Sequence, residues 1–242
     1  MRKPSKIKAV FFDIDDTLFD STTLAKMARI NAVKAMIEAG LPLTSVTQGC
    51  NLLMKIVDKY GSNYDKHFDK LLENLGCEWS PRIIAAGVIA YHDTNQAFLK
   101  PEPKVIPTLI ALRDRGYKLG IISNGKSVKQ WEKIIRLGLH HFFDAVVISE
   151  DVGSEKPDSR IFEVAMEKLN VKPWEAVYVG DDLETDILGA NIAGMVSIRI
   201  IRKKHREGSS SGKVIKPKYS IRKFSDLLSI LEKLDDAPLV SG

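Results

Sequence analysis

Cysteine is scarce in this sequence: Cys50 and Cys77 are the only two among 242 residues. They form no Cys-x-x-Cys pair and no paired histidines accompany them, which argues against a zinc site or a disulfide scaffold. We expect both to be small, buried apolar side chains. A reducing compartment is the simplest setting for such a chain.

The chain also lacks long apolar runs and a strong excess of either charge. No stretch reaches the roughly 20 apolar residues of a membrane-spanning helix, and the first apolar run stops at Asp13, too soon for a signal-peptide core. The 36 basic and 31 acidic residues leave a formal net charge of +5. This mild excess does not require nucleic acid but suits an anionic small molecule. We therefore expect a cytoplasmic protein without a membrane or nucleic-acid partner.

The chain is long enough for one large domain or two smaller ones with a proper core, and 44% of it is hydrophobic. Residues 7–12 form a short apolar run without alternation, which predicts a strand buried on both faces. About eighty residues with helical periodicity and no strand pattern follow. The helical segments predicted there cover residues 22–39, 52–60, 63–75 and 81–98.

From Pro103 onward, strands and helices alternate, which predicts a parallel sheet covered by helices on both faces. The expected fold class is α/β, with a Rossmann-like doubly wound parallel sheet that an all-helical insert interrupts after the first strand. The basic segment 202–218 predicts a flexible loop. The strands predicted here are 118–122, 145–148, 176–179 and 196–200, and the helices are 105–115, 127–137, 159–169, 183–193 and 224–234.

Three carboxylates, Asp13, Asp15 and Asp16, stand directly after the first predicted strand. Like charges this close repel, and each raises the cost of ionising its neighbours. A cation would relieve the repulsion, and hard oxygen ligands suit Mg²⁺. Because residues two apart on a strand point the same way, Asp13 and Asp15 should face one site. That site would lie at the carboxyl end of the strand, where open α/β sheets bind ligands.

Two simpler interpretations of this cluster can be compared with it. An EF-hand calcium loop starting at Asp13 would need glycine and glutamate where the chain has Leu18 and Leu24, so it is rejected. An acidic turn after a strand is common, and Asp-x-Asp alone would favour it. The chemistry at the other strand ends makes the acidic turn a poor explanation.

Three later segments supply matching chemistry. Ser123-Asn124-Gly125 follows a strand, and its hydroxyl and backbone N–H groups suit a phosphate oxygen. Lys156, in the loop before the helix at 159–169, could offset phosphate charge as a point cation. Gly180-Asp181-Asp182 ends another strand, with Asp186 one turn further on, and forms a second acidic cluster. Each signal is weak alone, but together and in this order they indicate an active site.

These segments resemble the four motifs of the haloacid dehalogenase (HAD) superfamily, and the resemblance covers residues 7–234. The insert resembles the helical cap of the phosphoglycolate-phosphatase-like branch. Within that branch, residues 85–92 and 128–134 are similar to archaeal glyceraldehyde 3-phosphate phosphatases. The four motif segments are Asp13-Ile14-Asp15-Asp16-Thr17-Leu18, Ser123-Asn124-Gly125, Lys156-Pro157-Asp158 and Gly180-Asp181-Asp182.

The resemblance implies a role for each motif residue. Asp13 would be the nucleophile that forms an aspartyl-phosphate, and Asp15 would be the general acid and then the general base. The Asp13 carboxylate, the Asp15 backbone carbonyl and Asp181 would hold Mg²⁺. The phosphoryl oxygens would be bound by Ser123, Asn124 and Lys156.

Other residues would support the site from further out. Asp182 or Asp186 would orient water ligands or hold Lys156, and Thr17 would stabilise the loop. The superfamily often has glycine where this chain has Asp16, and we expect the change to be tolerated, with Asp16 as a solvated or capping acid.

The expected function is a Mg²⁺-dependent phosphatase acting on a small phosphorylated metabolite, with glyceraldehyde 3-phosphate suggested by resemblance alone. The catalytic core would comprise residues 1–19 and 101–242, and the helical cap residues 20–100, in a monomer or homodimer. A phosphomutase would keep all four motifs. A haloacid dehalogenase would need Asp13 but neither a second acid nor a metal. A non-catalytic nucleic-acid-binding protein using the basic loop is the least favoured alternative.

Overall fold

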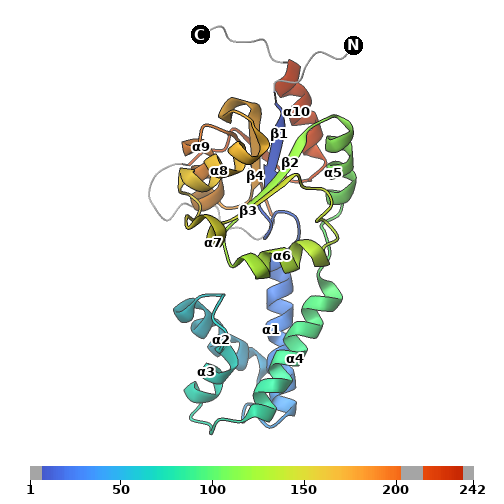
Figure 1. The fold of residues 1–242 in the computed structure, drawn as a ribbon. Helices are drawn as coiled ribbons and strands as arrows, with labels where there is room; N and C mark the ends of the chain where they lie inside the picture. The colour runs from blue at the N-terminus through green and yellow to red at the C-terminus, as the bar shows by residue number, and fades with distance from the viewer. Residues whose placement is uncertain (1–6, 203–214, 237–242) are drawn as a thin grey trace. The chain divides into compact units, whose positions relative to one another are not determined.

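The structure is a computed structural model that describes residues 7–202 and 215–236 (Figure 1). Most of the predicted basic loop, residues 203–214, lies outside this part of the chain. The chain divides into two compact units. One combines the residues up to Asp20 with those from Lys100 onward, and the other is Ser21–Leu99. Within the described ranges, no helix has both the length and the apolar character needed to cross a membrane.

The first unit is built on a six-stranded sheet in the order β3-β2-β1-β4-β5-β6, and every pair of neighbouring strands is parallel. The order reverses at β1, which lies between β2 and β4. This arrangement confirms the predicted doubly wound α/β fold. The strands are β1 (Ala9–Phe12), β2 (Lys118–Ser123), β3 (Ala145–Ile148), β4 (Ala176–Gly180), β5 (Val196–Ile200) and β6 (Tyr219–Ile221).

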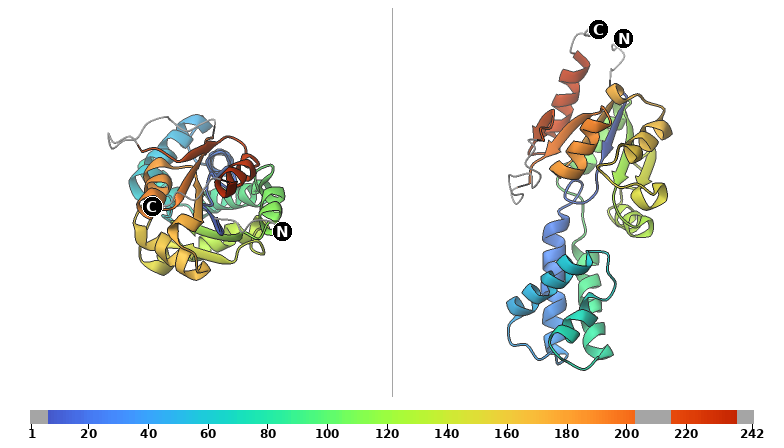
Figure 2. Two further views of the ribbon diagram at one scale, coloured as in Figure 1. Left: turned by 90° about the horizontal axis from the view of Figure 1, so that it is seen from above. Right: turned by 90° about the vertical axis from the view of Figure 1, so that its left-hand side faces the viewer.

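Helices cover both faces of this sheet, with α5 and α10 on one face and α8 and α9 on the other (Figures 1 and 2). Neighbouring residues of β1 point to opposite faces: Phe12 stacks on Phe224, which precedes α10, and Phe11 packs with the α8 side chains. The helices of this unit are α5 (Val105–Asp114), α6 (Ser127–Arg136), α7 (Ser149–Val152), α8 (Ser159–Leu169), the 3₁₀ turn η1 (Pro173–Glu175), the π-helical turn η2 (Leu183–Ile187), α9 (Leu188–Ile192) and α10 (Asp226–Asp236).

The second unit is all-helical, and α1 packs along α4. A hydrogen bond of 3.0 Å from Asn31 on α1 to Thr94 on α4 links the two helices. The buried side chains of this unit, among them Met36, Leu53 and Leu71, form a core of their own. The helices are α1 (Ser21–Glu38), α2 (Val46–Tyr60), α3 (His67–Asn74) and α4 (Pro81–Phe98).

The structure departs from the predicted elements at several points. The helix predicted at 52–60 begins earlier, at Val46, and the helix predicted at 63–75 is shorter, His67–Asn74. The first strand is shorter than predicted and begins at Ala9 rather than at residue 7. The helix predicted at 183–193 is divided into η2 and α9. Two elements were not predicted, α7 and β6, because four and three residues are too few to show a period.

The close pairing of β1 and β2 gives a stability prediction at Gly120, which lies beside Phe11 in the parallel register. A Cβ atom at Gly120 would lie 2.5 Å from Cδ1 of the buried Phe11 ring. Gly120→Ala should therefore lower the free energy of unfolding by about 1–3 kcal/mol through overpacking, as measured by urea titration. In a Phe11→Leu background the same change should cost clearly less. An equal cost in both backgrounds would contradict this explanation.

Candidate active site

A cavity of about 190 Å³ opens at the carboxyl ends of β1, β2 and β4. Its position matches the switch point of the sheet, where the strand order reverses. Of the predicted site residues, the cavity gathers all but Thr17. The lining residues are Asp13, Asp15, Asp16, Ser123, Asn124, Lys156, Asp181, Asp182, Thr185 and Asp186.

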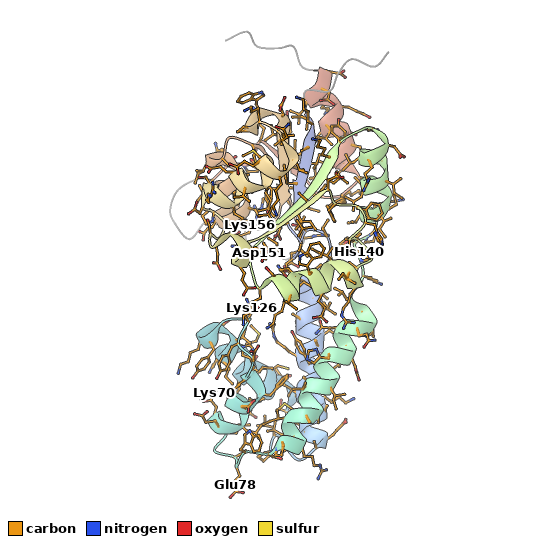
Figure 3. The ribbon with its side chains drawn as sticks, in the orientation of Figure 1. Lys70, Glu78, Lys126, His140, Asp151 and Lys156 are labelled. Carbon is orange, nitrogen blue, oxygen red and sulfur yellow. The ribbon has the colours of Figure 1, made fainter. Side chains whose placement is uncertain are left out.

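Lys156 is the buried cation of this cavity, and it stands on the segment that joins α7 to α8 (Figure 3). Its side chain is only 4% exposed. Its Nζ lies 2.6 Å from Oδ1 of Asp13 and 2.7 Å from Oδ1 of Asp186, and donates to the Tyr178 hydroxyl at 3.0 Å. A buried ammonium is tolerated only when such partners surround it. Lys156 therefore joins the ends of β1 and β4.

Asp186 uses both of its oxygens within the protein. Oδ1 accepts from Lys156 and lies 2.9 Å from the Tyr178 hydroxyl, and Oδ2 accepts from the backbone N–H groups of Asp181 and Asp182 at 3.1 and 3.2 Å. The wide π-helical turn of η2 brings the side chain back to the strand end. A Cβ atom at Gly180 would lie 2.4 Å from Oδ2, so the close approach requires glycine there.

Asp15 has a different environment from Asp13. Its side chain is 37% exposed, and both of its oxygens are paired with Nζ of Lys133 on α6, at 2.9 and 2.6 Å. Gln130, one turn earlier on α6, donates to the Ser123 hydroxyl at 2.7 Å and to the Asn124 carbonyl at 2.8 Å. Lys133 and Gln130 were not predicted from the sequence as residues of this site. Their spacing of three residues on the helix after Ser123-Asn124-Gly125 was the available signal.

The amide of Asn124 is occupied by the backbone of Lys156. Its Nδ2 donates to the Lys156 carbonyl at 3.1 Å, and its Oδ1 accepts from the Lys156 N–H at 2.8 Å. This reciprocal pair fixes the loop that presents Lys156 to the cavity. Asp182 is exposed and caps η2 by accepting from the N–H groups of Glu184 and Thr185, both at 2.8 Å.

The turn after Asp15 contains a residue with left-handed backbone. Asp16 has φ = 52°, a conformation that glycine adopts readily and aspartate tolerates better than most residues. This explains why the superfamily pattern often has glycine here and why aspartate can replace it. Thr17 is fully buried, and within the described ranges its hydroxyl has no hydrogen-bond partner, although its carbonyl accepts from Arg202.

The carboxylates of the cavity are difficult to ionise together. Burial raises the pKa of Asp13 to about 7, although the Lys156 ammonium opposes the shift, and the nearby Asp186 and Asp15 add to it. Burial also raises the pKa of Asp181 to about 9, with Asp186 and Asp13 as the next causes. The fold therefore holds more negative groups here than one ammonium can neutralise.

This excess of carboxylate fits a divalent cation. One oxygen from each of Asp13, Asp181 and Asp186 lies within 4.8 Å of the others. Because Asp186 already accepts four hydrogen bonds, Asp13 and Asp181 are the carboxylates better placed to bind an ion. Oxygen donors of this kind suit a hard ion such as Mg²⁺.

Comparison with known proteins defines the class to which this chain belongs. A family model described as haloacid dehalogenase-like hydrolase matches residues 10–200. The chain therefore belongs to the haloacid dehalogenase-like hydrolases, which confirms the resemblance seen in its motifs.

Individual relatives are also similar over nearly their full length. Glyceraldehyde 3-phosphate phosphatase of Methanopyrus kandleri is 52% identical over 94% of this chain and 98% of its own. The crystal structure of a HAD phosphatase from Thermococcus onnurineus shares 30% identity, with a TM-score of 0.66 over 93% of this chain and 98% of its own. YfnB of Bacillus subtilis, solved bound to magnesium, has the same fold at 24% identity, with a TM-score of 0.66 over 93% and 98% of the two chains.

The raised carboxyl pKa values predict how stability depends on pH when metal is removed. Asp13 and Asp181 hold protons in the folded state that they release at much lower pH when unfolded, so the folded state binds more protons. The stability they contribute is full below pH 4 and is lost as the pH rises through about 7 and about 9.

This dependence can be measured as the melting temperature in EDTA at pH 5, 7 and 9. Asp181→Asn should lose less stability between pH 7 and 9 than the wild-type protein. Asp114→Asn, which changes an exposed carboxylate on α5, should follow the wild-type curve. Equal curves for all three proteins would refute the assignment.

Proposed function

We propose that this protein is a Mg²⁺-dependent phosphatase that hydrolyses a small phosphorylated metabolite through an aspartyl-phosphate. The observation that supports it most is the buried ion pair of Lys156 with Asp13 beside Ser123, because a carboxylate, a cation and a hydroxyl share one cavity. Glyceraldehyde 3-phosphate is the first substrate to test, because the Methanopyrus kandleri relative bears that name and is similar over almost the whole chain.

In the proposed first step, a carboxylate oxygen of Asp13 attacks phosphorus, and the bond from phosphorus to the leaving oxygen breaks. Asp15 donates a proton to that oxygen as it leaves. The Lys156 ammonium and the Ser123 hydroxyl bind the phosphoryl oxygens and stabilise the charge that develops on them.

In the second step, Asp15 takes a proton from a water molecule, which attacks the phosphorus of the aspartyl-phosphate. The bond between phosphorus and Asp13 breaks, and inorganic phosphate is released with the Asp13 carboxylate restored. A bound Mg²⁺, held by Asp13, Asp181 and the Asp15 carbonyl, would supply charge neutralisation for the phosphoryl group.

The remaining residues act on these groups in the proposal. Asp186 holds Lys156 in place, and Asn124 fixes its backbone, so we assign Asn124 to positioning as much as to phosphate binding. Asp182 shapes the turn that carries Asp181 and Asp186. We further propose that residues 20–100 act as the cap that restricts the substrates, with residues 1–19 and 101–242 as the catalytic core.

The first test is release of inorganic phosphate from glyceraldehyde 3-phosphate and from 4-nitrophenyl phosphate in the presence of Mg²⁺. EDTA should abolish the activity and added Mg²⁺ should restore it. Asp13→Asn should lower kcat on the order of 10³-fold or more, because the nucleophile is lost, whereas Asp114→Asn should match the wild type.

Activity that survives both EDTA and Asp13→Asn would exclude the mechanism. Transfer of phosphate to a sugar without release of inorganic phosphate would favour the phosphomutase alternative. Release of halide from a 2-haloacid with no phosphatase activity would favour a dehalogenase.

A second test separates the two acids that the motifs supply. Asp15→Asn should lower kcat about 10²–10⁴-fold, the usual contribution of general acid–base catalysis. It should leave Mg²⁺ affinity, measured by calorimetry, close to that of the wild type, because only its carbonyl is a proposed ligand. Asp181→Asn should weaken Mg²⁺ binding strongly. Equal losses of Mg²⁺ affinity in the two variants would contradict the assignment.

A further inference from the structure

Arg202, which follows β5, contacts the turn that carries Asp15. Its Nε donates to the Asp16 carbonyl at 2.8 Å and its Nη2 donates to the Thr17 carbonyl at 2.7 Å. Its Nη1 lies 3.1 Å from a carboxylate oxygen of Glu102, and the Arg202 side chain is only 19% exposed. One planar guanidinium thus binds two consecutive carbonyls and a carboxylate, a geometry that lysine cannot reproduce.

Arg202 adds contacts to a turn that also has a backbone hydrogen bond of its own, from the Leu18 N–H to the Ile14 carbonyl at 2.9 Å. Asp16 has a left-handed backbone, and the hydroxyl of Thr17 has no partner among the described residues, so that hydroxyl does not fix the turn. Glu102 also contacts this turn directly, because its backbone N–H donates to the Leu18 carbonyl at 2.9 Å. Arg202 and Glu102 therefore hold residues 16–18 from outside the cavity.

Asp13 and Asp15 differ in how far their positions depend on the contacts that Arg202 and Glu102 make. Asp13 is buried at the strand end, and its N–H donates to the Val179 carbonyl of β4 at 3.0 Å. Asp15 lies beyond the strand, and its side chain is 37% exposed. The Asp15 carboxylate is held from one side by the Lys133 ammonium, and the path of the backbone through residues 16 and 17 sets its position from the other.

We propose that Arg202 is a positioning residue for Asp15. The proposal rests on the proposed function, in which Asp15 transfers a proton to the leaving oxygen. Proton transfer needs the two oxygens within hydrogen-bond reach, and a shift of about 1 Å can cost 10²-fold in rate. Arg202 touches neither substrate nor metal in this scheme and acts only through the backbone of residues 16 and 17.

The leaving group provides a test that a purely structural role would not satisfy. The alkoxide from glyceraldehyde 3-phosphate is strongly basic and needs a proton to leave, whereas 4-nitrophenolate leaves readily without one. In the Mg²⁺-loaded full-length protein, Arg202→Gln should lower kcat/KM about 10–10²-fold for glyceraldehyde 3-phosphate. For 4-nitrophenyl phosphate the loss should stay within about 3-fold, because Asp13 and Lys156 are undisturbed.

Arg113 on α5 provides a matched control. Its Nη1 also donates to two carbonyls, those of His141 at 2.8 Å and Phe142 at 3.0 Å, away from the cavity lining. Arg113→Gln should leave kcat/KM unchanged for both substrates. Glu102→Gln, which keeps both Arg202 carbonyl contacts, should show the same substrate-dependent loss as Arg202→Gln but a smaller one. Arg202→Lys should recover only part of the lost activity, and it carries the test if Arg202→Gln does not fold.

The outcomes test the proposed phosphatase function and the positioning role of Arg202 separately. A wild-type protein that releases phosphate from neither substrate would overturn the proposed function. An active wild type whose Arg202 variants lose the same factor on both substrates, or on neither, would overturn the positioning role and leave the phosphatase assignment intact. A loss confined mainly to glyceraldehyde 3-phosphate would support the inference.

Discussion

The rest of the site depends on the interactions of the buried Lys156 ammonium. Two carboxylates at 2.6 and 2.7 Å and a tyrosine hydroxyl at 3.0 Å surround it. A charge so deeply buried is stable only with close partners. Asp13 follows β1, Tyr178 lies on β4 and Asp186 lies on η2, so these contacts require the neighbouring strands β1 and β4 to be paired. The reciprocal bonds between Asn124 and the Lys156 backbone then fix the lysine from a fourth segment, the loop after β2.

The sheet and most helices could be predicted from the sequence because their signals are local. β1 is buried on both faces, and its unbroken apolar run shows this directly. The strand order is not local, because the neighbours of β1 are β2 and β4, far away in sequence. The π-helical turn η2 could not be predicted from the sequence either. Asp186 on this turn accepts hydrogen bonds from the backbone N–H groups of Asp181 and Asp182, and these bonds depend on the folded end of β4.

The candidate site could be predicted in part, because several of its polar residues directly follow strands in the sequence. Asp13, Ser123, Lys156 and Asp181, which were predicted to share a site, all line one cavity. Partners that reach the cavity from other elements could not be predicted in this way. Tyr178 looks like an ordinary residue of a buried strand in the sequence, yet its hydroxyl completes the Lys156 environment. Lys133 and Arg202 are similar in this respect, since a basic residue on a helix or shortly after a strand is usually solvated.

The contrast between the two acids of the first motif follows from their positions. Asp13 directly follows β1 and is almost fully buried, so few water molecules compete for its carboxylate. Asp15, two residues later, has left the strand and is more than a third exposed beside Lys133. In the proposed mechanism a nucleophile gains from a dry environment, whereas an acid–base group must exchange protons with water in each cycle. Asp13 directly follows the last residue of β1, and Asp15 lies two residues further from the strand, so one short motif supplies both environments.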